Sequence, residues 1–118
     1  SNTDSYDGFG LAVALADELA LVGAPGESSA AITVDGDGLD DSAPQAGAGY
    51  LFAREAGGAW VPRSYVKAWN GQAGDAFAWS VALTPEALLL GAVLEDGAST
   101  RINGDPADDS ASAAGALY

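Results

Sequence analysis

The sequence contains no cysteine and no histidine, and it has four lysine and arginine residues against 17 aspartates and glutamates. Without cysteine the chain forms no disulfide and no thiolate metal site. Without histidine it lacks the usual general base and the commonest ligand of transition metals. The resulting net charge of −13 argues against binding to nucleic acid or to an anionic membrane surface, because both require a cationic protein surface.

Long apolar runs and catalytic motifs are also missing. No apolar run approaches the ~18–20 residues of a membrane span, and there is no Gly-x-Ser-x-Gly motif of the kind that presents a nucleophilic serine. Paired carboxylates could support glycosidase chemistry, but the acidic residues lie mainly in glycine-rich stretches that we expect to be solvated. The few cations are too scattered to predict a phosphate site. We therefore predict that the chain is not an enzyme.

The chain repeats itself at an offset of 68 residues. The stretch FGLAVALADELALVGAP, from Phe9, aligns with FAWSVALTPEALLLGAV, from Phe77. Without a gap, the same offset aligns Tyr50 with Tyr118, and roughly two in five of the 50 comparable positions are identical. Self-similarity at a fixed spacing indicates a repeated structural unit.

Alternation of large and small residues predicts the first strand. Leu11, Val13 and Leu15 fall on one face of this strand and alanines on the other, because successive side chains of a strand point to opposite faces. The small face predicts that another element packs closely against it. A second strand is expected at residues 19–23, so that Asp17-Glu18 forms a tight hairpin turn.

The rest of the unit predicts a long loop and two more strands. Residues 27–47 are rich in Gly, Ser, Asp and Ala, and loops of this length are usually functional. A third strand is expected at 49–54 and a fourth at 60–68. The fourth contains Pro62, which cannot donate to a sheet ladder, so we expect it at the edge of an antiparallel meander. In the second copy, strands are predicted at 79–83 and 88–91, with a third beginning at the last two residues.

Phe9-Gly10 before the first strand and Gly23-Ala24-Pro25 after the second resemble the FG-GAP repeat. This family includes the blades of the integrin alpha-subunit propeller and repeats of bacterial extracellular proteins. The second copy keeps Phe77 and Gly91-Ala92 but has Ala78 where the motif has Gly. The resemblance implies an all-β fold of four-stranded, propeller-blade-like units at an extracellular or cell-surface location. About one and three-quarter units are present, one in residues 1–68 and an incomplete one in 69–118.

The length of the chain limits the architectures that it can form. Propellers close with four to eight blades, and four units at this spacing would need about 270 residues, so 118 residues cannot close a ring alone. We expect a part of a larger propeller, an oligomer of partial rings, a fibre subunit, or a sandwich of two sheets. Unpaired strand edges favour pairing with further copies of the chain.

The most acidic stretches are VDGDGLDDS, from Val34, and INGDPADDS, from Ile102. Calcium takes six to eight oxygen ligands from flexible, glycine-containing loops, so these stretches are candidate calcium sites. The alternative is a solvated turn in which each Asp hydrogen-bonds its own backbone. The calcium cage of the integrin pattern does not carry over, because only a two-residue turn joins the first two strands. The candidate ligands are Asp35, Asp37, Asp40, Asp41, Asn103, Asp105, Asp108 and Asp109.

Other positions recur in both copies or carry aromatic rings. Glu27 and Glu95 are either a further ligand pair or surface charge, and surface charge is favoured. Asp7 and Asp75 are expected to cap turns. Trp60 and Trp69 could form a sugar-stacking platform, although packing at a sheet edge is favoured. Core or inter-unit packing is expected for Phe9, Tyr50, Phe77 and Trp79.

Three functions remain open. The first is a non-catalytic, self-assembling structural module, which forms filaments or oligomers and has calcium-ordered loops. The second is an adhesion or carbohydrate-recognition module that binds a protein or glycan ligand as part of a larger propeller. The third is an inactive slice of a larger propeller enzyme. The first is favoured by the incomplete second unit and its unpaired strand edges.

Overall fold

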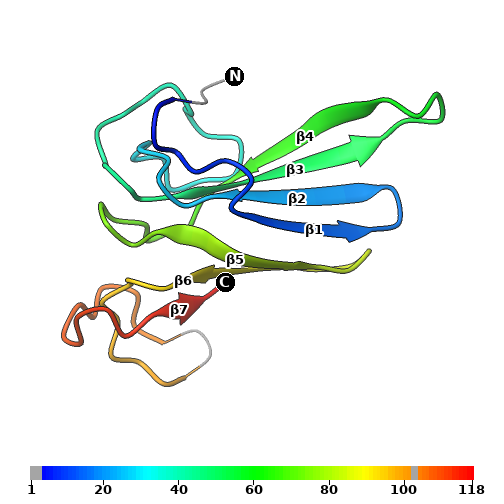
Figure 1. Cartoon of the computed structure of the whole chain (residues 1–118). Coiled ribbons are helices and arrows are strands. Elements are labelled where there is room, and N and C mark those ends of the chain that lie inside the picture. Colours follow the sequence, from blue (N-terminus) through cyan, green and yellow to red (C-terminus); the bar gives the residue numbers. More distant parts are fainter. Residues whose placement is uncertain (1–3, 102–103) are drawn as a thin grey trace.

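A computed structural model describes residues 4–101 and 104–118, and these residues form strands and loops without a helix (Figure 1). No helix that could span a membrane therefore occurs in this part of the chain. The prediction of an all-β fold is confirmed. The strands are β1 (Ala12–Ala16), β2 (Leu19–Ala24), β3 (Ala48–Arg54), β4 (Trp60–Val66), β5 (Phe77–Leu83), β6 (Leu88–Ala92) and β7 (Ala116–Leu117).

The strands form two antiparallel sheets, ordered β1-β2-β3-β4 and β5-β6-β7. Neither sheet closes into a barrel or propeller within the described residues. Asp17 and Glu18 connect β1 to β2, and Asp17 has a positive φ of 50°, as expected for a tight turn. Pro62 lies in β4 at the edge of the first sheet. The predicted meander, its hairpin turn and its outermost strand are confirmed.

The two sheets pack face to face, with β5 against β1 and β2. Their shared core contains Leu21, Val66, Phe77 and Leu90, and burial of such side chains is the main favourable term in folding. The sheets approach closely because glycines lie at the contact. A Cβ atom on Gly23 would lie 2.2 Å from the carbonyl oxygen of Ala78, so a side chain there would force the backbones apart.

The alanine face of β1 is partly buried, as the alternation of large and small residues predicts. Ala12, Ala14 and Ala16 are partly buried, whereas Val13 and Leu15 are exposed. The aromatic predictions hold in part. Phe77 is buried and Tyr50 is half-buried, but Phe9 and Trp79 are largely exposed. Phe9 and Trp79 therefore do not lie in the core between the two sheets, and inter-unit packing of these two rings stays a prediction.

Backbone hydrogen bonds recur at the 68-residue offset. Gly47 N–H donates to Glu27 O at 2.8 Å, and Gly115 N–H donates to Glu95 O at 2.9 Å. The bond from Ala43 N–H to Ser28 O has its equivalent between residues 111 and 96. The left-handed backbone recurs too, since Gly10 and Ala78 have φ values of 92° and 65°. Ala78 thus keeps the conformation that glycine adopts more readily at the equivalent position.

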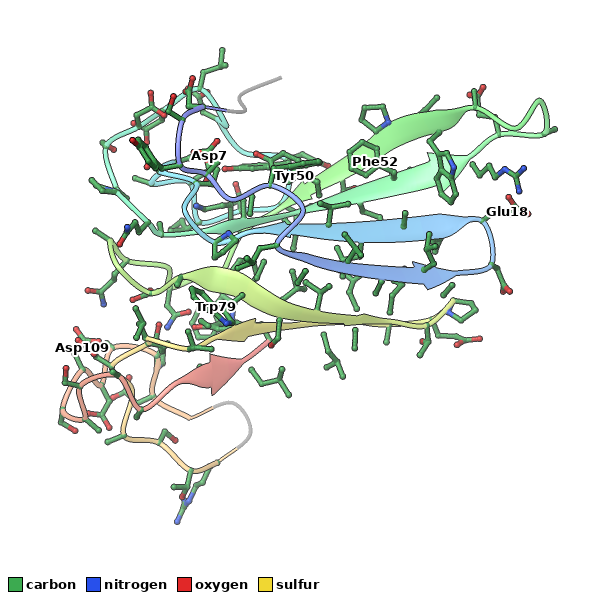
Figure 2. All side chains as sticks on the ribbon, in the orientation of Figure 1. Asp7, Glu18, Tyr50, Phe52, Trp79 and Asp109 are labelled. Carbon is green, nitrogen blue, oxygen red and sulfur yellow. The ribbon has the colours of Figure 1, made fainter. Side chains whose placement is uncertain are left out.

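Both long connections, β2 to β3 and β6 to β7, leave their sheets at the same end, opposite the tight hairpins (Figure 1). Figure 2 shows this polarity, with Asp109 among the loops and Glu18 at the far hairpin. Asp7 caps a turn at the loop end, since its Oδ2 accepts from Asp4 N–H at 2.7 Å. Asp75 does the same for Gln72 N–H at 2.6 Å. The predicted capping role of both aspartates is confirmed.

Candidate functional site

Carboxylates hold the first acidic loop in place, some by hydrogen bonds within the loop and one by a hydrogen bond to β4. Asp35 Oδ1 accepts from Tyr65 N–H at 2.7 Å, which ties the loop to β4. Asp37 Oδ1 accepts from Leu39 N–H at 2.9 Å. Asp40 accepts from Ser42 and from Ala30 N–H, and these hydrogen bonds, led by that from the Ser42 hydroxyl, lower the pKa of Asp40. The neighbouring Asp41 is also in this loop.

The second acidic loop uses its carboxylates in the same way. Asp105 Oδ1 accepts from Ala107 N–H at 3.0 Å, and Asp108 Oδ1 accepts from Ser110 N–H at 3.1 Å. Asp109 accepts from the side-chain amide of Gln72 at 3.2 Å. Asn103, the remaining candidate ligand, lies outside the described residues.

These carboxylates do not converge on a common point. Within residues 4–101 and 104–118, no group of three or more acidic side chains is placed to hold a metal ion. The hydrogen bonds that Asp37, Asp40, Asp105 and Asp108 accept from backbone two residues on match the solvated-turn alternative, in which aspartate stabilises its own loop. Calcium binding by these loops stays a prediction.

The loop is anchored by a buried ion pair that the sequence did not predict. Lys67 Nζ donates to Glu27 Oε2 at 3.0 Å and to Ser29 O at 2.7 Å. The Lys67 and Glu27 side chains are only 1% and 2% exposed, and burial is the main cause that lowers the pKa of Lys67. Glu27 Oε1 also accepts from Ser29 N–H. The pair therefore joins the loop to the end of β4.

The interpretation of Glu27 and Glu95 as surface charge is wrong, because both residues are buried. Each glutamate comes after the second strand of its sheet, and its side chain is buried. The backbone carbonyl of each glutamate also accepts a hydrogen bond from an N–H group at the end of the long loop. The sequence signal was the recurrence of Glu at this position together with Lys67, the chain's single lysine, directly after β4. A lysine 40 residues away in sequence could not be assigned to Glu27 from spacing alone.

Glu95 has a different environment from Glu27. Its Oε1 accepts from Asn70 Nδ2 at 3.2 Å, and its Oε2 lies 3.5 Å from the Tyr118 hydroxyl. No lysine or arginine forms an ion pair with it among the described residues. Burial, followed by repulsion from Asp75 and Asp109, raises the pKa of Glu95 to about 7. Its carboxyl group is thus partly protonated near neutral pH.

The raised pKa of Glu95 predicts a pH-dependent stability. Because the folded-state value of about 7 exceeds the ordinary value of about 4.3, the folded chain binds this proton more tightly than the unfolded chain. The stabilisation is complete below the ordinary pKa and is lost as the pH rises through about 7. We expect Glu95→Gln, which is uncharged throughout, to gain in melting temperature relative to the wild type between about pH 5 and pH 8.

Thermal melts across this pH range measure the difference between the two proteins. Glu86→Gln, at an exposed hairpin position, is the matched control and should show a difference that does not change with pH. A Glu95→Gln difference that is equally constant would contradict the assignment.

The surface of the described residues has grooves, among them the following two. The first, of about 510 Å³, is lined by aromatic rings that include Phe9, Tyr50, Phe52 and Tyr65. Phe9 packs edge-on against Tyr50 and Phe52, with ring centroids 5.3 and 6.3 Å apart, and Figure 2 shows Tyr50 and Phe52 on the side of β3 away from β5. The second groove, of about 800 Å³, runs from the end of β4 to β7 and reaches Glu95.

Trp60 and Trp69 do not form a single platform. Trp60 begins β4 and Trp69 follows its end, so the length of the strand, on the order of 20 Å, separates them. Trp69 lines the second groove, and Trp60 lies in the hairpin half of β4. A sugar platform made of both rings is therefore excluded.

Each sheet also presents an apolar face to solvent. The outer face of the first sheet carries Val13, Leu15, Val22, Tyr50 and Phe52, which cross-strand pairing places on one side. The outer face of the second sheet carries Ala82, Leu89 and Leu117, opposite the core residues Leu88 and Leu90. Val13, Leu15, Leu89 and Leu117 are exposed by 66%, 72%, 47% and 68%.

Comparison with family models, with curated proteins and with solved structures finds no match to this chain. The resemblance to the FG-GAP repeat stays a prediction that rests on the motif residues.

Proposed function

We propose that this chain is a non-catalytic structural module that associates with further copies of itself through the two outer faces. We further propose, from the motif resemblance, that it belongs to an FG-GAP-like repeat array outside the cell. The proposal includes ordering of the acidic loops by calcium, which measurement of association in EDTA tests.

One observation carries the proposal: each exposed outer face is the repeat equivalent of a face that is buried between the sheets. Val13 and Leu15 are exposed, but their equivalents Val81 and Leu83 pack against the core. The relation reverses on the other side of the contact, where Leu21 is completely buried and its equivalent, Leu89, is largely exposed.

The contact between the two sheets of one chain therefore has the residue pattern that we expect for the contact between two copies of the chain. The outer face of the first sheet has the residue pattern that the second sheet uses to pack on the first. The outer face of the second sheet has the pattern that receives it. Two different faces that fit each other form a heterologous, head-to-tail contact, which produces rings or open filaments. Apolar faces of this kind on a soluble domain mark association sites.

The test is the mass of the purified chain over a range of concentrations, measured by analytical ultracentrifugation. The wild type is expected to form oligomers, and Leu15→Asp should weaken association by about tenfold or more, since a Leu side chain contributes about 1.5–3 kcal/mol when buried. Tyr6→Asp, at an exposed position outside both sheets, is the matched control. A wild type that stays monomeric up to its solubility limit would refute the proposal.

Mixing two variants distinguishes a head-to-tail contact from a symmetric one. Leu15→Asp keeps the outer face of the second sheet intact, and Leu89→Asp keeps that of the first. Each should fail to form long oligomers alone, whereas an equimolar mixture should form a one-to-one dimer that grows no further. Growth of either variant alone to wild-type size contradicts the head-to-tail contact. Repeating the wild-type measurement in EDTA shows whether association requires calcium.

The aromatic groove favours a second candidate function, recognition of a glycan or a protein ligand. Tyr and Phe rings provide the apolar surface on which ligands stack, and pockets of this size hold small ligands. A glycan screen of the wild type and of Phe52→Ala tests it, since binding that depends on Phe52 places the ligand in this groove. Binding that Phe52→Ala leaves unchanged would contradict this candidate.

A further inference from the structure

The outer edge of β4 is covered by a residue of the first acidic loop. β4 lies at the edge of the first sheet (Figure 1) and pairs with β3 on one side only, among the described residues. The outer backbone groups of an edge strand pair readily with a strand of another molecule, which is a common route to aggregation. In this chain, Asp35 occupies that position on β4.

Asp35 bonds both backbone groups of Tyr65. Its N–H donates to Tyr65 O at 2.7 Å, and its Oδ1 accepts from Tyr65 N–H at 2.7 Å. One residue thus makes both of the bonds that the opposite residue of an added antiparallel strand would make. Asp35 has a positive φ of 56°, a conformation that Asp and Asn adopt more readily than most residues. The residue type therefore suits the contact.

Other features of β4 oppose pairing at the same edge. Pro62 has no backbone N–H, and Arg63 is exposed and charged. The register between β3 and β4 shifts next to Phe52, and such an irregularity bends a strand. Proline, charge and bulges are the means by which natural sheets avoid edge-to-edge pairing. Asp35 adds a further protection, beyond Arg63 in the direction of the loops.

We propose that Asp35 blocks the edge of β4 from pairing with β4 of a second copy, and so restricts self-association to the outer faces. Two identical edges can pair symmetrically when their strands run antiparallel. The strand, WVPRSYV, is rich in Val, Tyr and Trp, which favour strands, so its edge is competent to pair once it is uncovered. The restriction to the outer faces rests on the proposed function, whereas the blocking contact does not.

Two variants that differ only at position 35 test this role. Both carry Leu15→Asp, which weakens association through the outer face, and Arg63→Thr, which removes the charge from the edge. In one of them, Asp35→Gly removes the side-chain acceptor and keeps a residue that adopts a positive φ readily. In the matched control, Asp35→Asn keeps a side-chain oxygen that accepts a hydrogen bond.

Hydrogen exchange measures the contact, and analytical ultracentrifugation measures its consequence. We expect Tyr65 N–H to exchange about tenfold or more faster in the Gly variant than in the Asn variant, because its side-chain acceptor is lost. The amide of the core residue Leu21 should stay protected in both, which shows that both are folded. The Gly variant should form dimers at concentrations at which the Asn variant is a monomer.

Equal association of the two variants would overturn the inference. So would a folded Gly variant that stays monomeric, equal exchange of Tyr65 N–H in both variants, or dimers whose formation does not slow exchange in β4. Failure of the proposed function has a different sign, because it appears as a wild-type chain that stays monomeric. That result leaves the comparison of the two variants unchanged, since both already carry Leu15→Asp.

Discussion

Replacement of Lys67 by alanine is expected to lower the free energy of unfolding by about 3–5 kcal/mol. The substitution removes the cation from a carboxylate that is almost completely buried. It also removes the hydrogen bond to Ser29 O, which fixes the long loop. A loss of this size is a large part of the total stability of a small domain.

Urea denaturation measures this change, and the chain offers a matched control. Arg54 forms an ion pair with Glu18 at 3.9 Å, but the two side chains are about half and two-thirds exposed. Exposed pairs contribute about 0–1 kcal/mol, so Arg54→Ala should change stability little. The double variant Lys67→Met/Glu27→Gln should recover part of the loss, because it removes both buried charges. Equal effects of Lys67→Ala and Arg54→Ala would contradict the role of the buried pair.

Replacement of Phe77 by alanine is expected to cost about 3–5 kcal/mol. Phe77 is 1% exposed, lies in the core between the two sheets, and packs edge-on against Tyr118 with centroids 5.4 Å apart. Its repeat equivalent, Phe9, makes the same edge-on contact with Tyr50 but is 44% exposed. Phe9 also packs edge-on against Phe52, so a smaller loss for Phe9→Ala in spite of this additional ring contact reports the contribution of burial between the sheets.

Thermal or urea unfolding of both variants, at a concentration at which the chain is monomeric, gives this comparison. Phe9→Ala should cost clearly less than Phe77→Ala in the monomer. If the two variants lose equal stability under these conditions, packing between the sheets is not what makes Phe77 important.

Much of the fold could be predicted from local sequence signals. Alternation along residues 11–15 and the position of Pro62 each depend on neighbours within one strand, so the strands, the first turn and the sheet edge followed from the residues. Phe9 shows the limit of this reasoning. Both phenylalanines have the same local sequence signal, and only the stacking order of the sheets decides which one is covered.

The candidate site could be predicted much less well. The aspartates from Asp35 to Asp41 are compatible with a cation site and also with turns in which aspartate accepts hydrogen bonds from nearby backbone. The sequence does not distinguish the two, because the same residues at the same spacing occur in both. The ion pair of Glu27 and Lys67 depends on a contact between segments far apart in the chain, which no spacing rule encodes. Burial of a glutamate after a glycine-rich strand end is a tertiary property.

The placement of both long loops at one end of the molecule (Figure 1) has a consequence for how such a chain tolerates change. Ten of its 17 acidic residues fall within residues 25–47 and 93–115, which contain these loops, whereas the outer faces lie on the strands. In a head-to-tail assembly the loops would form one continuous acidic margin, and the hairpins would form the other. The length of the loops and their exposed residues could then vary while the buried Glu27 and the geometry of stacking, set by the strands, are preserved.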